Sequence, residues 1–220
     1  MRFFFPLLLF FIVYLLFIFF DYTSIHKWIK PLLIPSLLFF YLINLKGKPR
    51  IKLIAALLLS AAGDTLLMFD GPNFLIFGLV AFLFAHILYI LIFKSFLKSL
   101  SINRFVLLCS FLIVLYYVLF MSFLWPGLGK MKMPVLFYAF AISMMLWLSF
   151  QVFQKLGNAA LYMLLGAFFF VFSDSLLSIK LFHTDFFRAH FFVMFTYLLA
   201  QFLLVYGLVK IETRKHFISN

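Results

Sequence analysis

The stretch LIAALLLSAAGDTLLMF, residues 53–69, carries a single aspartate, Asp64, within an otherwise uncharged run. The stretch LYMLLGAFFFVFSDSLLSI, residues 161–179, carries Asp174 in a near-copy of the same phrase. A carboxylate in a segment that faces hydrocarbon costs at least about 2.5 kcal/mol on insertion scales, so such residues usually face a bundle interior or a wet cavity. The two stretches therefore predict membrane helices that share a functional site.

The composition supports a membrane location. The 220 residues are 67% hydrophobic and 23% aromatic but only 11% charged, whereas soluble domains are roughly half apolar. Apolar runs of about 20 residues cross a bilayer as helices, and they lack the alternation of polar and apolar residues that barrel strands require. The sequence predicts an all-α, polytopic membrane protein in which residues 1–220 form a single membrane domain.

Gaps in the hydropathy separate eight apolar runs. We expect transmembrane helices near residues 3–20, 30–45, 52–69, 73–93, 104–123, 134–153, 158–179 and 189–209. The first run follows Arg2 as a signal peptide would, but no small-x-small cleavage site follows it, so we expect this helix to be retained.

The net charge of +12 would suggest a nucleic-acid partner for a soluble protein, but helix geometry offers another explanation. With eight helices, both termini and every second loop lie on one side of the membrane. Twelve of the 18 Lys and Arg residues fall on that side and six on the other. Because basic loops stay in the cytoplasm, we expect both termini to be cytoplasmic in a bacterial inner membrane. Membrane lipids, and no nucleic acid, are the expected partners of the surplus charge.

Matching phrases predict an internal repeat, with halves near residues 1–100 and 101–220. The phrase around Asp64 matches the phrase around Asp174, and the proline-containing starts of the second and sixth helices also match. The segment at Ala85-His86 in the fourth helix can be set against Ala200-Gln201 in the eighth. Four helices per half is an even number, so the two halves are expected to run parallel to each other.

Both aspartates are expected in the outer portions of their helices, each six residues before the next charged residue, Asp70 or Lys180. At about 1.5 Å per residue, they lie roughly 8 Å below the outer helix ends. Two carboxylates that face one cavity repel each other, so one keeps its proton while the other stays ionised. The pair can then supply a general acid and a general base.

Other polar side chains are expected near the two aspartates. Lys30 opens the second helix from the outer side, where it can neutralise an aspartate, meet a lipid phosphate or snorkel to the interface. Polar residues deeper in membrane helices can contact a substrate or form hydrogen bonds between helices. The candidates for substrate contact, besides Lys30, are His86, Tyr89, Tyr138, Ser173, Tyr197 and Gln201.

Several of these phrases occur in an order that is found in a known family. They are Lys30-Pro31-Leu32, Gly63-Asp64, residues 77–82 with Ala85-His86 and Tyr89, Tyr138 with Met145-Leu146-Trp147, Gly166 to Asp174, and Tyr197 to Gln201. Together they resemble the YhhN-type lysoplasmalogenase family of polytopic membrane proteins. The first helix and the Lys-rich tail match little.

The resemblance implies that the chain hydrolyses the alkenyl ether bond of a lysophospholipid, which yields a fatty aldehyde and a glycerophospho head group. It also implies that Asp64 and Asp174 are the catalytic pair. The residues suit this chemistry, because a neutral carboxylic acid can protonate the vinyl ether and a carboxylate can stabilise the cation and activate water. No cofactor and no metal is expected, since the sequence has no His-Glu-x-x-His motif and no paired cysteines.

Two other classes of function stay open at this point. Intramembrane acids in a parallel repeat also occur in proton-coupled transporters. The chain can alternatively bind lipid without turnover. The aldehyde released from a lysoplasmalogen would distinguish the hydrolase from both alternatives.

Overall fold

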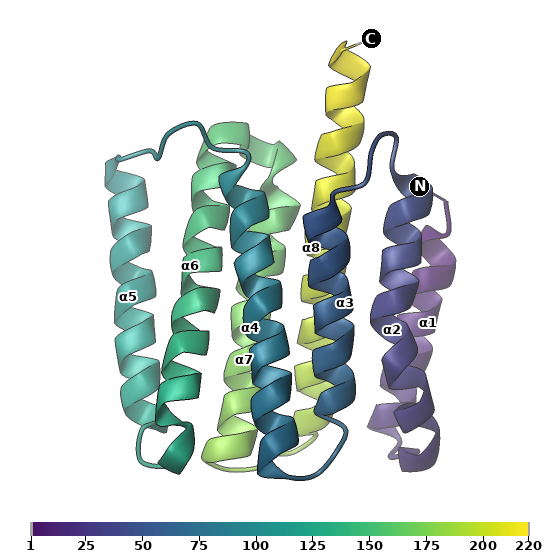
Figure 1. Ribbon diagram of the computed structural model, residues 1–220, viewed down its shortest axis with the longest axis vertical. Helices are drawn as coiled ribbons and strands as arrows, with labels where there is room; N and C mark the ends of the chain where they lie inside the picture. Colours follow the sequence, from purple (N-terminus) through teal and green to yellow (C-terminus); the bar gives the residue numbers. More distant parts are fainter. Residues whose placement is uncertain (1, 220) are drawn as a thin grey trace.

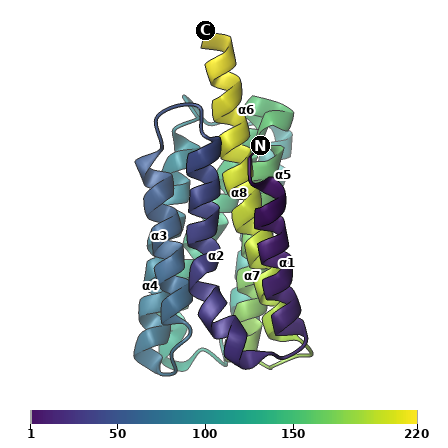
Figure 2. The same ribbon diagram turned by 90° about the vertical axis from the view of Figure 1, so that its right-hand side faces the viewer.

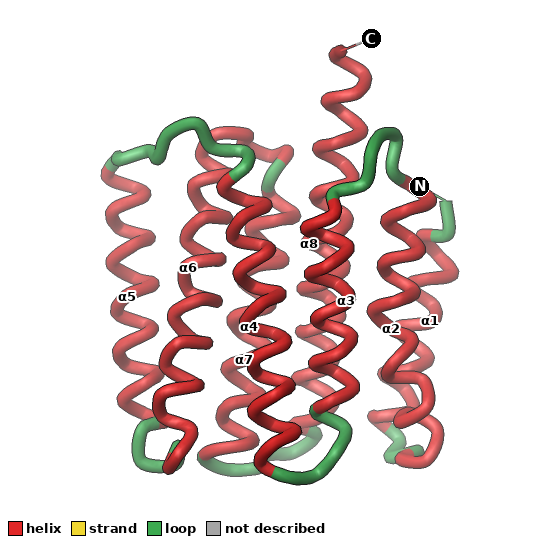
Figure 3. The backbone as a smooth tube through the Cα atoms, in the orientation of Figure 1, coloured by secondary structure: helices red, strands yellow, loops and turns green. Residues whose placement is uncertain are grey.

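The structure, a computed structural model, describes residues 2–219 and their side chains, except the side chains of residues 23–26 and 214–219. Within this range it contains α-helices and two short 3-10 helices, Gly129–Met131 and Gly157–Ala159, and no strand (Figure 3). The α-helices are α1 (Phe4–Phe19), α2 (Thr23–Asn44), α3 (Ile51–Leu66), α4 (Pro72–Lys94), α5 (Arg104–Leu124), α6 (Lys132–Leu156), α7 (Leu161–Phe182) and α8 (Ala189–Ser219).

Five segments of the described chain are long and apolar enough to cross a membrane. They contain α4, α5, α6, α7 and α8, the last as far as Thr213. The helix α1 is apolar but has only 16 residues. Length and composition therefore support a polytopic membrane protein.

Six helices form a closed ring. Going round the ring, α2 packs against α3, α3 against α4, α4 against α6, α6 against α7, α7 against α8, and α8 against α2. Successive helices run in opposite directions, so the two ends of the chain lie at the same end of the bundle (Figures 1 and 2). We call this the terminal end and the other one the far end.

The two remaining helices lie outside the ring. Helix α1 packs on α2 and α8, whereas α5 packs on α6 and touches α7 (Figure 1). Large side chains of α5, such as Leu108, Phe111 and Leu119, are exposed. One face of α5 is thus available to lipid.

Small residues let the two most extensively packed helix pairs approach closely. A Cβ atom added to Gly63 of α3 would lie 2.7 Å from the Phe82 ring of α4. One added to Gly166 of α7 would lie 2.8 Å from the backbone nitrogen of Leu204 in α8. A backbone atom cannot move aside as a side chain can, so Gly166 sets the spacing between α7 and α8.

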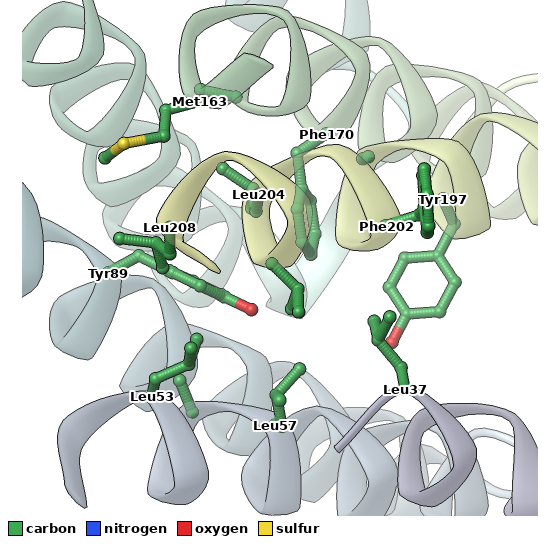
Figure 4. Close-up of a cluster of buried hydrophobic side chains, with 14 of the residues drawn as sticks. Leu37, Leu53, Leu57, Tyr89, Met163, Phe170, Tyr197, Phe202, Leu204 and Leu208 are labelled. Carbon is green, nitrogen blue, oxygen red and sulfur yellow. The ribbon is translucent and has the colours of Figure 1, made fainter. Parts of the chain in front are cut away.

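Apolar side chains fill the interior of the ring toward the terminal end. Leu53, Met163, Leu204 and Leu208 are fully buried and project inward from three different helices (Figure 4). This core closes the terminal half of the ring.

Polar contacts tie the ring together above this core. Arg50, just before α3, forms an ion pair with Glu212 of α8 and donates a hydrogen bond of 3.0 Å to the hydroxyl of Ser95, at the end of α4. The backbone N–H of Arg50 donates to the hydroxyl of Tyr41 in α2 at 2.9 Å. One residue thus joins four helices at the terminal end.

Six predicted helix boundaries differ from the structure by three residues or more. The second helix begins at Thr23, not at residue 30, and the eighth extends to Ser219, not to residue 209. The third helix ends at Leu66, not at residue 69, and turns follow it. The sixth helix ends at Leu156, not at residue 153, and the seventh is Leu161–Phe182, not residues 158–179. Hydropathy detects only the part of a helix that is apolar, and polar residues such as those after 209 can continue a helix in water. Pro31 and Pro35 lie inside α2, which changes direction in its first half (Figure 2).

Candidate functional site

A cavity of about 460 Å³ lies at the far end of the ring. Its wall comes from α2, α3, α4, α7 and α8 and from the turn between α3 and α4. This volume lies within the roughly 300–1,000 Å³ typical of small-molecule sites. The lining residues are Lys30, Asp64, Leu67, Phe69, Asp70, Gly71, Pro72, Leu75, Phe82, Ser173, Asp174, Leu177, Lys180, Leu181, His190, Val193, Met194 and Tyr197.

Asp64 and Asp174 both line this cavity, from α3 and α7. Asp64 is only 4% exposed, and Asp174 is partly buried. Both carboxylates border the same space, where like charges repel each other. The sequence pattern thus brings together two acids that are 110 positions apart in the chain.

A tyrosine hydroxyl donates a hydrogen bond to each aspartate. Tyr197 of α8 donates to Oδ2 of Asp64 at 2.7 Å. Tyr138 of α6 donates to Oδ2 of Asp174. In both cases the tyrosine belongs to a different helix from its aspartate, so the two hydrogen bonds fix both carboxylates across helix boundaries.

Cationic side chains share the cavity with the two acids. Lys30 is 9% exposed. Its ammonium group is attracted by the carboxylate of Asp64 and repelled by the ammonium group of Lys180. Lys180 and His190 also line the cavity. The cavity therefore offers positive charge for an anionic group as well as carboxylates for acid–base chemistry.

The expected position of Lys30 at the helix start was wrong. Because α2 begins at Thr23, Lys30 is the eighth residue of the helix, about 10 Å from its start at 1.5 Å per residue. The residue as a whole is buried. Lys30 therefore lies in the wall of the cavity rather than at the surface.

A polar layer lies between the cavity and the closed core. Tyr89 donates a hydrogen bond of 2.7 Å to Oε1 of Gln201, and Nε2 of Gln201 donates to Ser60 at 3.1 Å and to the Tyr197 hydroxyl at 3.4 Å. All four residues are buried. This chain of hydrogen bonds connects α3, α4 and α8 and supports the tyrosine that contacts Asp64.

His86 lies beside this layer. It is fully buried, and its ring meets Phe170 and Tyr138 edge to face, with centroids 4.6 Å and 5.2 Å away. His86, Tyr89, Tyr138 and Gln201 do not line the far-end cavity in the described structure. Their contact with a substrate therefore stays a prediction.

Ser173 lines the cavity next to Asp174. Its hydroxyl donates a hydrogen bond of 3.0 Å to the carbonyl oxygen of Val193 in α8. This contact joins α7 to α8 immediately beside the second carboxylate. Ser173 thus has a structural role in addition to its position in the wall.

A comparison with family models finds a match over residues 25–208, to the model described as the YhhN family. The match contains α3, α4, α5, α6 and α7 in full and most of α2 and α8. The chain belongs to the YhhN family. Searches of curated proteins and of solved structures found no match.

The YhhN match encloses every residue that lines the cavity and leaves α1 outside. Helix α1 also lies outside the six-helix ring. The family region of this YhhN protein is therefore the ring and its cavity, together with α5.

Asp70, Lys180 and His190 were not predicted as site residues of this YhhN protein. A periodic signal could have found two of them. Residues 173, 174, 177, 180 and 181 of α7 line the cavity, as do residues 190, 193, 194 and 197 of α8, and both sets have the spacing of one helix face. The helix face of α7 that contains Asp174 also contains Lys180. The face of α8 that contains Tyr197 also contains His190.

Among the described residues, no group of three or more His, Cys, Asp and Glu side chains is arranged to hold a metal ion. The polar side chains in the cavity carry carboxylates, hydroxyls, ammonium groups and the imidazole of His190. This set is suited to binding an anion and to transferring protons.

Proposed function

We propose that this YhhN-family protein is a membrane-embedded hydrolase that cleaves the alkenyl ether bond of lysoplasmalogens. The products are a fatty aldehyde and a glycerophospho head group. The observation that carries the proposal is the cavity that Asp64 and Asp174 line together with Lys30 and Lys180. Asp64 and Asp174 act as the acid and base, and the two lysines hold the phosphate.

In the first chemical step, the protonated aspartate transfers its proton to the β-carbon of the vinyl ether. The carbon attached to oxygen then becomes part of an oxocarbenium ion, which the ionised aspartate stabilises. The same carboxylate takes a proton from a water molecule as the water attacks this carbon, and a hemiacetal results. The hemiacetal then collapses to the aldehyde: its hydroxyl gives its proton to the aspartate that acted as acid, and the glycerol oxygen leaves with the proton held by the other aspartate, so both groups return to their starting states.

The tyrosines that contact the aspartates support this division of roles. Each hydroxyl holds one carboxyl oxygen, so the other oxygen is available to face a substrate. Holding reacting groups in one orientation supplies a large part of a catalytic rate increase. The hydrogen bonds from Gln201 to Tyr197 and from Tyr89 to Gln201 extend this support away from the cavity.

We also propose that all eight α-helices span the membrane, with both termini in the cytoplasm of a bacterial cell and the far end outside. The location of both termini at one end of the bundle supports an even number of spans (Figure 1). The charge distribution supports the orientation, since 12 of the 18 basic residues lie on the terminal side. The substrate then reaches the cavity from the outer leaflet.

The contact pattern supports a parallel repeat of two four-helix halves. Each helix of the first half corresponds to the helix four places later in the chain. The α2–α3 contact then corresponds to α6–α7, the α3–α4 contact to α7–α8, and the α4–α6 contact to α8–α2. All of these contacts occur. The repeat accounts for one aspartate from each half in a shared cavity.

The test is hydrolysis of a lysoplasmalogen by the purified protein, followed as aldehyde released. We expect Asp64→Asn and Asp174→Asn each to lower the rate by at least about 100-fold, the lower end of the contribution of a general acid or base. The double variant is expected to lose little more than either single variant, because the two groups act together. Aldehyde release at the wild-type rate by either single variant would remove that aspartate from the mechanism.

A further inference from the structure

Asp174 faces two separate spaces in this protein. One is the far-end cavity within the ring. The other is a narrow space of about 30 Å³ between α5, α6 and α7, which Asp174 lines together with Tyr138 and Ser175. Asp64 lines only the first. Asp174 therefore lies on the boundary between the polar cavity and the outer face of the ring.

The narrow space is constricted by two hydrogen-bonded contacts. Tyr138 of α6 donates to Asp174, and the hydroxyls of Tyr116 and Ser175 join α5 to α7. We call this space the neck. It is closed to a large group but lies where α5, the least buried of the membrane-length helices, packs against the ring.

An apolar groove of about 510 Å³ lies next to the neck, between α5 and α6. The neck and the groove share Tyr117 and Ser143, so the two spaces are neighbours. The groove is lined almost entirely by apolar atoms. Its lining residues are Ser110, Ile113, Val114, Tyr117, Val118, Phe140, Ser143, Met144 and Trp147.

The groove has a direction and an end. Its α6 wall runs from Phe140 to Trp147, which are seven residues apart and so about 10 Å apart along the helix. This length is about a third of the roughly 30 Å hydrocarbon core of a bilayer. Trp147 donates a hydrogen bond of 2.7 Å to Ser110 of α5, and this contact links the two helices at the groove's terminal side.

The polar cavity, the neck and the apolar groove lie in the same order as the parts of a lysolipid, which are its polar head group, the junction and its apolar chain. The cavity holds Lys30 and Lys180 at the far end of the bundle, and the groove runs from there toward the middle of the bundle. A lysolipid in the outer leaflet has the same orientation, with its phosphate at the interface and its chain pointing inward. The junction between head group and chain would then lie at the neck.

We propose that the groove between α5 and α6 binds the hydrocarbon chain of the substrate, and that the bond to be cleaved lies at the neck beside Asp174. This proposal rests on the proposed function and adds to it a chain-binding site and an assignment of roles. The β-carbon of the vinyl ether is on the chain side of the bond, so Asp174 donates the proton. Asp64, in the cavity next to Lys30, activates the water that attacks the carbon bonded to oxygen.

The chain-binding site can be tested without turnover. The probe is a saturated alkyl-ether lysophosphocholine with a diazirine near the end of its chain, which has no vinyl ether and is not a substrate for the proposed reaction. After irradiation in nanodiscs, we expect peptides of α5 and α6 that line the groove to be labelled, and an excess of unlabelled lysolipid to abolish the labelling. Labelling mainly of α1 or α3, or labelling that excess lysolipid does not reduce and that therefore reports bulk lipid, would overturn the proposal.

Two variants test the groove through chain length. Val118→Phe and Val114→Trp enlarge two exposed residues that line the groove but not the neck, so neither disturbs a buried core or the space at the scissile bond. We expect each to raise KM for a long-chain substrate at least about tenfold, the equivalent of roughly two methylenes withdrawn from the groove, and a short-chain substrate to be little affected. Ser122→Phe, on an exposed part of α5 that lines neither space, is the matched control.

The outcomes separate this proposal from the proposed function. Labelling of the groove by a protein that releases no aldehyde would overturn the hydrolase and leave the chain-binding site. Aldehyde release with an unchanged long-chain KM in both variants would leave the hydrolase and overturn the chain-binding site. An equal rise in KM for long and short chains would overturn it as well.

Discussion

Lys30 and Asp64 carry opposite charges in the wall of one cavity, so we expect their contributions to stability to be coupled, and a double-mutant cycle measures the coupling. Lys30 is 9% exposed and Asp64 is 4% exposed. We consider Asp64→Asn, Lys30→Met and the double variant. Asparagine keeps an oxygen that can accept the hydrogen bond from Tyr197, which is 2.7 Å long in the wild type, so Asp64→Asn mainly removes charge.

The expected size of the coupling follows from this arrangement. Each single variant leaves one buried charged group without its counter-charge, whereas the double variant removes both. Coupled residues typically show interaction energies of about 0.5–3 kcal/mol, and we expect Lys30 and Asp64 to fall in this range. For a chain of this size, 1 kcal/mol corresponds to about 2–4 °C in Tm, so the double variant is expected to be about 1–12 °C more stable than the sum of the single losses implies.

Thermal unfolding in one detergent provides the four Tm values, and aldehyde release provides the four rates. Asp70→Asn is the control, because Asp70 lines the same cavity but is exposed, and its Tm should change little. Additive losses of Tm would refute the coupling of Lys30 and Asp64. Recovery of aldehyde release in the double variant would refute the chemical role of Asp64, because it would show that the carboxylate serves only to neutralise Lys30.

Three further outcomes are expected. Gly166→Ala should lower the free energy of unfolding by about 1–3 kcal/mol, because the new methyl group meets the α8 backbone at 2.8 Å. Gly47 faces open space, so Gly47→Ala should change this free energy by less than about 0.5 kcal/mol. Thermal unfolding measures both variants. In a cysteine-free background, Asn73→Cys and His183→Cys should react with an impermeant thiol reagent from outside the cell, and reaction only from the cytoplasmic side would reverse the proposed topology. Lys180→Ala should raise KM for a phosphate-bearing substrate much more than for a neutral analogue without the head group, and equal effects would exclude a phosphate contact.

The sequence predicted the helices well because hydropathy reports directly on burial in lipid. Eight apolar runs correspond to eight α-helices in the described chain, and an uncharged run around each aspartate signals a buried carboxylate. The family resemblance was also confirmed by the match over residues 25–208. Hydropathy does not indicate which helices are neighbours in the bundle. Nothing in the apolar runs indicates that α4 packs on α6 and leaves α5 outside the ring.

The site illustrates the same limit at the level of single residues. Depth along a helix can be counted from the sequence, but the direction of a side chain around the helix also depends on the neighbouring helices. Phe82 and His86 are one turn apart in α4, yet Phe82 lines the cavity and His86 is enclosed by two rings. Lys30 was expected at the helix start because its helix was expected to start there, and its burial became evident only from the packed ring.

The closed terminal end of the ring has an electrical consequence. A charge that crosses an entire membrane changes its energy by about 2.3 kcal/mol for every 100 mV. The core around Leu53 and Leu208 and the Arg50–Glu212 ion pair above it separate the aspartates from the terminal end. In the proposed reaction, a proton taken up from the far end would therefore return to the far end, and no net charge would cross the membrane. Turnover in sealed vesicles is expected to be independent of the membrane potential, whereas proton-coupled transport that carries net charge would vary with it.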